Sequence, residues 1–308
     1  MITGLLSGVL WALDTVILSV ALSMNGFNNE LLFLVPFIST FLHDLSSAIY
    51  LIIFMFIKKQ KALFIKALKS KAGKYIIIGA LFGGPIGMSC YIIAIKNIGP
   101  GYTAVISSMY PALGAFFAHI FLKENMNKIQ VCGLILSILG IIILGYNNTS
   151  IAYNNAALGF ICAVLCCISW GSEAVICAYG MKDPMVNNEQ ALRIRQITSA
   201  IIYMIMFIFM LNNSNDIIHI LSTRESLIIY GAAFFGTVSY LFYYKAIMVL
   251  GASKAMPLNI TYSAWAILFS FIILNTLPDI KMILCGIVIV IGALLAATDI
   301  YKFFREID

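Results

Sequence analysis

The chain has 308 residues, of which 62% are hydrophobic and only 10% are charged. Soluble domains carry about 25% charged residues, and the apolar residues here form blocks of about twenty, each able to cross a hydrocarbon core of roughly 30 Å. This composition excludes a soluble protein and predicts a polytopic membrane protein. The net charge of +6 does not indicate nucleic-acid binding, because the basic residues fall in short loops at one membrane face.

Ten transmembrane helices are expected, which makes the fold class an all-α polytopic membrane protein. The expected spans are 3–24, 31–57, 73–97, 101–122, 128–146, 156–180, 188–211, 225–249, 254–275 and 280–302. The first span lacks a basic leading segment and a small-residue cleavage site, so we interpret it as a retained helix and not as a signal peptide.

Lysine and arginine are distributed unevenly between the two ends of these spans. One end carries Lys58, Lys59, Lys61, Lys66, Lys69, Lys71, Lys74, Lys123, Lys128, Lys182, Lys254, Lys302 and Arg305. The other end carries Lys96, Arg224 and Lys281. Because cytoplasmic loops hold the excess of basic residues, we expect both termini in the cytoplasm.

An internal repeat divides the chain into two halves. An offset of 152 residues superimposes several glycine and aromatic residues, including Gly84 on Gly236 and Tyr110 on Tyr262. The expected units are a first five-helix repeat at 1–146, an outer linker at 147–155 and a second five-helix repeat at 156–308. Five spans per half invert the second repeat, and transporters of this kind place their site near the midplane between the halves.

Two tryptophan–carboxylate pairs carry the functional argument. Trp170 precedes Glu173 by three residues in the sixth span, and Trp11 precedes Asp14 by three in the first. Residues three apart share a helix face, so ring and carboxylate point into the same space. An ionisable residue at membrane depth is costly and by default marks function. An anion beside an aromatic face is also what a buried organic cation needs.

Other polar residues lie deep in the spans. The offset places His43 and Asp44 of the second span opposite Arg195 and Gln196 of the seventh. Arg195 either forms a structural ion pair with one of the buried carboxylates or takes part in gating. Histidine has an unperturbed pKa near physiological pH, so His43 suits proton coupling, yet a lone buried histidine is often only a satisfied hydrogen-bonding group.

His119 and Lys245 are interpreted as interfacial or snorkelling side chains, and Arg193 is interpreted as snorkelling in preference to a buried role. Gly83-Gly84-Pro85 in the third span is either a gating hinge or a place where helices pack closely. The seven cysteines fall within the expected spans without a C-x-x-C motif, and we read them as small hydrophobic residues.

Further aromatic residues are spaced to join the two tryptophans. The candidates are Tyr91, Tyr110, Tyr243, Tyr262 and Trp265. Two to four such rings with one carboxylate would suit a trimethylammonium group, although each ring taken alone could equally be a packing residue.

Five longer motifs carry a family resemblance. They are Gly84-Pro85-Ile86-Gly87-Met88, Ser108-Met109-Tyr110-Pro111-Ala112, Ser169-Trp170-Gly171-Ser172-Glu173, Ile194-Arg195-Gln196-Ile197-Thr198-Ser199 and Ala255-Met256-Pro257-Leu258-Asn259-Ile260-Thr261-Tyr262. With ten spans in two halves, the chain resembles the EamA-type permeases of the drug/metabolite transporter superfamily. The motifs resemble most closely the bacterial choline permeases of the Lic phosphocholine-decoration pathway.

This resemblance implies proton-coupled import of choline across a bacterial cytoplasmic membrane. The positions that match the central cavity of the family are Trp11, His43, Trp170, Glu173 and Tyr262. Asp14 departs from the family pattern, which has an uncharged residue there. A second carboxylate could add proton coupling, change the preferred amine or pair with Arg195.

Alternatives to choline import remain. An exporter of amino acids or other small amines is possible because the fold does not fix direction, and Arg195 within reach of Glu173 would favour such a zwitterionic substrate. An enzyme is not expected, because no metal-ligand cluster, nucleophile–base spacing or phosphate loop is present, and we expect no metal or cofactor. A receptor or scaffold would explain neither the repeat nor the buried charges. A monomer and a homodimer are both compatible with the sequence.

Overall fold

The computed structural model describes residues 1–22, 24, 35–107, 109–145, 155–210, 221–275 and 277–298, which contain helices and no strand. In this part of the chain, eight helices are long and apolar enough to cross a membrane, and two shorter apolar helices cover Tyr110–Leu122 and Lys128–Ile143. The chain is therefore a multi-pass membrane protein, as the composition predicts.

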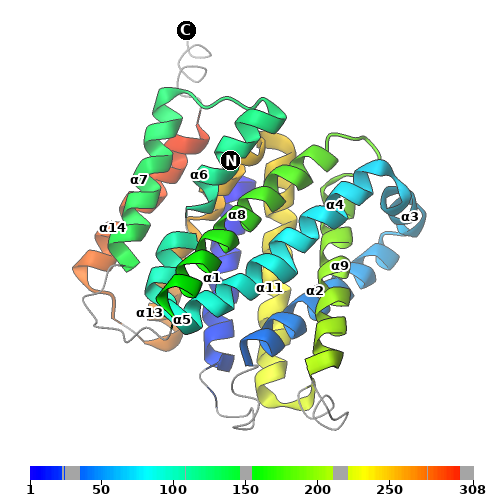
Figure 1. The fold of residues 1–308 in the computed structure, drawn as a ribbon, viewed down its shortest axis with the longest axis horizontal. Coiled ribbons are helices and arrows are strands. Elements are labelled where there is room, and N and C mark those ends of the chain that lie inside the picture. The colour runs from blue at the N-terminus through cyan, green and yellow to red at the C-terminus, as the bar shows by residue number, and fades with distance from the viewer. Residues whose placement is uncertain are drawn as a thin grey trace.

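The first half contains α1 (Ile2–Leu22), α2 (Val35–Ile57), α3 (Lys61–Lys69), α4 (Lys71–Leu81), the π-helix η1 (Phe82–Ile86), α5 (Gly87–Ser107), α6 (Tyr110–Phe117), the π-helix η2 (Ala118–Leu122) and α7 (Lys128–Gly145). The second half contains α8 (Ala156–Gly180), α9 (Asn188–Met210), α11 (Arg224–Leu250), α12 (Ala252–Asn259), α13 (Tyr262–Leu274) and α14 (Ile280–Ala297). Helices α1, α8 and α11 run through the middle of the bundle, whereas α7 and α14 pack together at one edge (Figure 1).

Three expected spans, the third, fourth and ninth, have different bounds from those predicted. The third was expected to end at residue 97, but α5 continues to Ser107, and the fourth begins at Tyr110 instead of 101. The ninth, expected as one helix over 254–275, is divided into α12 and α13 by Ile260 and Thr261. Pro100 lies inside α5 and Pro257 inside α12, so neither proline marks the residue at which its helix stops.

The two halves share structural features at the offset of the sequence repeat. After a break in the first half, α6 begins at Tyr110, and after a break in the second half, α13 begins 152 residues later, at Tyr262. At the α7–α14 contact, the Ser137 hydroxyl donates to the carbonyl of Ile289, 152 residues away, at 3.1 Å. This contact joins two positions that the sequence offset makes equivalent.

Helix α3 was not expected, because the lysine-rich segment after the second span was interpreted as a loop. Lys61, Lys66 and Lys69 are exposed, whereas Ala67 is buried and Phe64 packs against the main core. The segment is therefore a short amphipathic helix. Its many lysines led to its interpretation as a loop. Figure 1 places α3 and the N-terminus toward the same end of the bundle. Thr298, after α14, contacts Met1 there.

Some expected features lie outside the described residues. These are most of the linker at 147–155, Ser108, and Lys302 and Arg305 near the C-terminus.

Candidate functional site

A cavity of about 290 Å³ lies between the two halves of the chain. Small-molecule sites have volumes from about 300 to 1,000 Å³, so this cavity suits a small solute. Ten of the twelve candidate residues line it: Trp11, Asp14, His43, Tyr91, Tyr110, Trp170, Glu173, Arg195, Tyr243 and Tyr262. They come from α1, α2, α5 and α6 of the first half and from α8, α9, α11 and α13 of the second.

One wall of the cavity is an aromatic cluster around Trp170. The Trp170 ring lies 5.3 Å from the Tyr91 ring, and it meets the Tyr110 ring edge-on at 6.0 Å. In the same cavity, the Trp11 ring lies 4.9 Å from Tyr240 and 6.2 Å from His43, both edge-on. These offset and edge-to-face arrangements are the favourable ones for aromatic pairs. The two tryptophans of the sequence motifs therefore each belong to a group of contacting rings in one cavity.

The π-helix η1 brings backbone against the functional side chains. The Gly87 amide donates to the carbonyls of Phe82 and Gly84, and the carbonyl of Gly83 accepts from the Trp170 indole N–H at 3.2 Å. A Cβ on Gly83 would overlap the Glu173 carboxylate, and one on Gly84 would overlap the Ser199 hydroxyl. Of the two sequence interpretations of Gly83-Gly84-Pro85, this geometry supports close packing.

Five charged or titratable side chains form a chain of contacts through the site. Glu173 Oε1 lies 2.8 Å from Arg195 Nε, and Arg195 Nη1 lies 3.4 Å from Asp44 Oδ2. Asp44 Oδ1 lies 3.5 Å from His43 Nδ1, and His43 Nε2 lies 3.2 Å from Asp14 Oδ1. Asp14, His43, Asp44 and Arg195 are all buried, and Glu173 is partly buried. Buried charges of this kind are stable only when paired and hydrogen-bonded.

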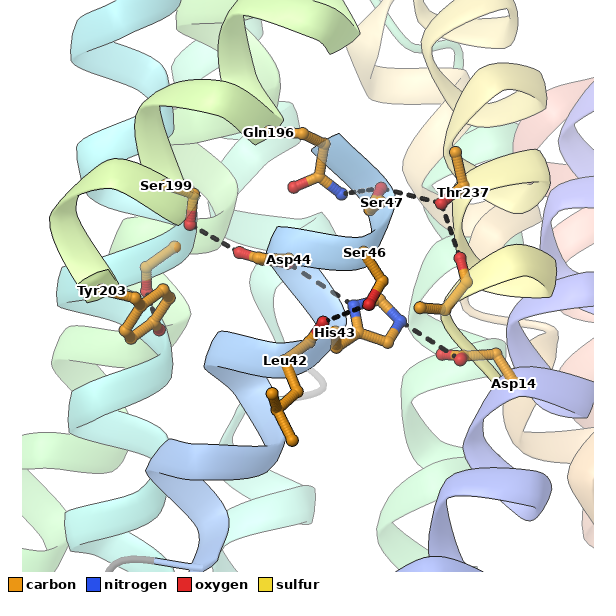
Figure 2. A network of polar contacts seen from close by, with 12 residues as sticks. Asp14, Leu42, His43, Asp44, Ser46, Ser47, Gln196, Ser199, Tyr203 and Thr237 are labelled. Atoms are coloured by element: carbon orange, nitrogen blue, oxygen red, sulfur yellow. Dashed lines mark hydrogen bonds and ion pairs between the residues drawn. The ribbon is translucent and has the colours of Figure 1, made fainter. Parts of the chain in front are cut away.

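The Asp44 side of this chain is anchored by neighbouring hydroxyl and amide groups (Figure 2). The Ser199 hydroxyl on α9 donates to Asp44 Oδ2 at 2.5 Å. The Gln196 amide donates to Ser47 at 2.9 Å, and Thr237 on α11 bonds to the same Ser47 hydroxyl at 2.8 Å. These contacts fix α2 against both α9 and α11, so the charges of α2 are held by the helices around them.

Arg195 is engaged on several sides. Besides its two carboxylates, its Nη1 donates to Gln196 at 2.6 Å, and its guanidinium carbon lies 5.0 Å from the centre of the Tyr240 ring. The Tyr244 hydroxyl donates to the same Glu173 oxygen that accepts from Arg195, at 3.2 Å. The guanidinium thus lies beside the Glu173 carboxylate and the Tyr240 ring, two groups that would also attract an organic cation.

Two candidate residues lie outside the cavity. Gln196 lies behind Arg195, where it bonds to Arg195 and Ser47. Trp265 lines a separate apolar groove between α13 and α14, and its indole N–H is buried with no partner in the described part of the chain. Placing Trp265 beside Tyr262 in one ring box was therefore incorrect.

The basic residues interpreted as interfacial divide into two groups. His119 and Lys245 are exposed and lie outside the cavity. Arg193, which was expected to snorkel, is wholly buried and contacts Glu189 at 3.2 Å on its own helix, and Glu189 also binds Lys58 at 2.8 Å. The interpretation of Arg193 was wrong because an acidic residue one turn away, bridged to Lys58, lets the guanidinium remain inside.

Sequence reasoning missed two tyrosines of the cavity, Tyr240 and Tyr244, and did not include Asp44 among the site residues. At the repeat offset, Tyr240 and Tyr244 correspond to Met88 and Ile92, so repeat matching gave no aromatic signal. Helix spacing could have found them, because residues 240, 243, 244 and 247 lie on one face of α11 and all line the cavity.

Comparisons with known proteins agree with this architecture. The chain is 34% identical over 226 residues to Protein LicB of Haemophilus influenzae, which covers 73% of this chain and 75% of the relative. It is 23% identical to the uncharacterized transporter YoaV of Bacillus subtilis, over 78% of this chain and 82% of the relative. A solved crystal structure has the same fold, with a TM-score of 0.74 at 16% identity over 96% of each chain. The EamA-like transporter family model matches residues 1–146 and 157–298, and the chain belongs to that family.

Proposed function

We propose that this transporter imports choline or a related quaternary ammonium ion across the bacterial cytoplasmic membrane, coupled to protons. Alternating access at the cavity between two inverted five-helix repeats would move the substrate. The two separate matches of one family model and the paired helix interruptions 152 residues apart support the repeat. The resemblance of the motifs to choline permeases and the similarity to LicB support the substrate class.

The observation that carries the proposal is that Glu173 lines the same cavity as Trp170, Tyr91 and Tyr110. A quaternary ammonium ion donates no strong hydrogen bond, so it is recognised by aromatic faces and a counter-charge. Both are available here on one wall, and the ring-to-ring distances of 5.3 and 6.0 Å keep the three rings together.

The charge of the cavity also favours a cation. Asp14, Asp44 and Glu173 line the cavity together with Arg195 and His43. With the carboxylates ionised, one guanidinium against three carboxylates leaves two negative charges when His43 is neutral and one when it is protonated. A cation reduces this imbalance, whereas an added carboxylate increases it.

The alternative is an exporter of amino acids or other small amines, and one observation favours it. Arg195 lies 2.8 Å from Glu173, as a site for both ends of a zwitterion would require. However, Nε of Arg195 already donates to Glu173, and Nη1 donates to Asp44 and Gln196. These contacts use three of the five N–H donors of the guanidinium, and two carboxylates already share its charge, so a substrate carboxylate would add a third anion to one cation. We therefore rank this alternative second.

A thermal-shift panel on the purified protein separates the two functions. We expect choline and other quaternary ammonium ions to raise the unfolding temperature, because a ligand that binds only the folded state stabilises it. Amino acids without a quaternary ammonium group are expected to leave it unchanged. A panel in which amino acids stabilise the protein and choline does not would select the exporter.

The aromatic wall is tested by measuring choline binding to two tryptophan variants. Trp170→Leu is expected to weaken choline binding by about 1–2 kcal/mol, roughly 5- to 30-fold in dissociation constant, because it removes the ring that contacts Tyr91 and Tyr110. Trp265→Leu is the matched control, since Trp265 lies in the other groove. A wild-type dissociation constant for Trp170→Leu, measured by titration calorimetry, would rule out the aromatic wall as the binding surface.

The proposed topology places both termini and α3 in the cytoplasm. A cysteine at Lys66, which is exposed on α3, is expected to react with a membrane-impermeant maleimide in inside-out vesicles but not in whole cells. A cysteine at Leu221, also exposed, lies before α11 at the opposite end and is expected to show the reverse pattern. Labelling of the Lys66 variant in whole cells would show that α3 lies outside the cytoplasm, and the proposed orientation would have to be reversed.

A further inference from the structure

Asp14 differs from the other two carboxylates of the cavity in its partner. Arg195 contacts Asp44 and Glu173, whereas the ion pair of Asp14 within the described residues is with His43. Because Asp14 does not contact the Arg195 guanidinium, Arg195 does not neutralise its negative charge, and another cation can do so. The sequence left three roles open for Asp14, namely proton coupling, a change in the preferred amine and pairing with Arg195. The structure pairs Asp14 with His43 and not with Arg195, so the first two roles remain.

The His43 ring lies between two carboxylates, with Nε2 facing Asp14 and Nδ1 facing Asp44 (Figure 2). A neutral imidazole has one N–H, so two hydrogen bonds to carboxyl groups require either an imidazolium or a protonated carboxyl that donates to the ring. In both cases Asp14, His43 and Asp44 together hold one proton more than a neutral imidazole between two ionised carboxylates. We call these three residues the proton-binding cluster, because their contacts require this additional proton.

Several elements enclose this proton-binding cluster. A Cβ on Gly236 of α11 would lie 2.6 Å from His43 Nε2 and 3.1 Å from the Asp14 carboxyl carbon, so the backbone of α11 presses against both. The charged or titratable groups on the surrounding helices are Asp14 from α1, Asp44 from α2, Glu173 from α8, Arg195 and Tyr203 from α9, and Tyr240 from α11. Arg195 is the permanent cation among them, and it is already shared by Asp44 and Glu173.

We propose that Asp14 allows the cavity to hold a proton and a substrate cation at the same time. This inference rests on the proposed function and deepens it. Arg195, one proton on the cluster and one monovalent cation together balance the three carboxylates. Without Asp14, the same proton and cation would leave one uncompensated positive charge in a buried site, which is strongly unfavourable. Proton and substrate would then compete for the cavity, and a cotransporter would lose its coupling.

The substitution Asp14→Asn tests this directly, because asparagine keeps the size of the side chain and an oxygen that can accept from His43. Choline affinity is measured by titration calorimetry at about pH 5.5 and about pH 7.5, on either side of the ordinary range of histidine. We expect the wild-type dissociation constant to change less than about threefold. In the variant we expect it to be at least about tenfold weaker at the acidic pH, since one competing proton changes affinity by up to tenfold per pH unit.

Transport in proteoliposomes gives a second readout. The Asp14→Asn variant is expected to lose the accumulation driven by an inward proton gradient to a greater extent than choline–choline exchange, which needs no net proton movement. Asp279→Asn is the matched control, because Asp279 caps α14 outside the cavity and asparagine can retain that cap. This control is expected to behave as wild type in both assays.

The outcomes separate the inference from the proposed function. If Asp14→Asn binds choline with the wild-type pH profile and still accumulates it, the inference is overturned and choline transport stands. If the wild type binds no quaternary ammonium ion, the proposed function fails first. Should Asp14→Asn not fold, His43→Gln removes the ring of the cluster instead and is expected to lose proton-driven accumulation to a greater extent than exchange. An unchanged ratio of accumulation to exchange in that variant would overturn the inference equally.

Discussion

Replacing Glu173 by glutamine is expected to weaken choline binding on the order of a hundredfold while the protein still folds. The change removes one negative charge without changing the size of the side chain. At a separation of about 5 Å and an effective dielectric constant of about 20, two unit charges attract by about 3 kcal/mol, which corresponds to a hundredfold or more in the dissociation constant. Titration calorimetry on the purified variant measures this loss.

The local structure explains why the fold should tolerate this change. The glutamine oxygen can still accept from Arg195 Nε and from the Tyr244 hydroxyl, as Glu173 Oε1 does at 2.8 and 3.2 Å. The amide also fits the space that Gly83 leaves open. Arg195 keeps Asp44 as a counter-ion, so no isolated charge remains. An affinity loss with unchanged thermal stability would therefore reflect the missing counter-charge.

Two comparisons control for other causes. Asp279→Asn removes a carboxylate far from the cavity in the same chemical way and is expected to bind choline as wild type does. Glu173→Asp retains the charge but shortens the side chain, so it is expected to lose less affinity than Glu173→Gln. Undiminished choline binding by Glu173→Gln would show that the counter-ion of the substrate is another carboxylate, and Asp14 would be the next candidate.

Sequence spacing anticipated which side chains share a space where a single helix carried the information. Trp170 and Glu173 lie three residues apart on α8 and line one cavity, as helix periodicity requires. For Arg195 the sequence left an ion pair with one of the buried carboxylates as one of two interpretations, and the structure shows contacts with Asp44 at 3.4 Å and Glu173 at 2.8 Å. Which carboxylates it reaches depends on how three helices pack, and spacing along one helix does not give that.

Sequence spacing did not give the location of a side chain that follows a helix interruption, or the contact partner of a side chain when that partner lies on another helix. Tyr262 is the first residue of α13, directly after the interruption at 260–261, so the direction of Trp265 depends on how α13 packs on α14. Three-residue spacing could not supply that packing. The partner of Asp14 was equally open, because four buried or partly buried ionisable groups on three other helices lie in the same cavity. Only the three-dimensional arrangement selects His43.

Replacing Arg195 by glutamine is expected to destabilise the protein by about 3–5 kcal/mol, because it leaves Asp44 and Glu173 buried without their shared cation. For a chain of this size, a loss of that magnitude lowers the unfolding temperature by roughly 10 °C, which a thermal-unfolding measurement in detergent detects. If Arg195 instead contributed no more than an exposed ion pair, the change would stay below about 1 kcal/mol.

The double variant Arg195→Gln/Glu173→Gln separates the structural role of this ion pair from substrate binding. Removing both partners leaves no unpaired charge between them, so its unfolding temperature is expected to recover part of the loss while its choline affinity stays low. The single Arg195 variant is expected to gain more stability from choline than wild type does, since the ligand then supplies the missing cation beside Glu173 and Tyr240. If betaine binding were lost selectively and choline binding unchanged, Arg195 would instead be the group that holds a substrate carboxylate, and the zwitterion transporter would be the correct assignment.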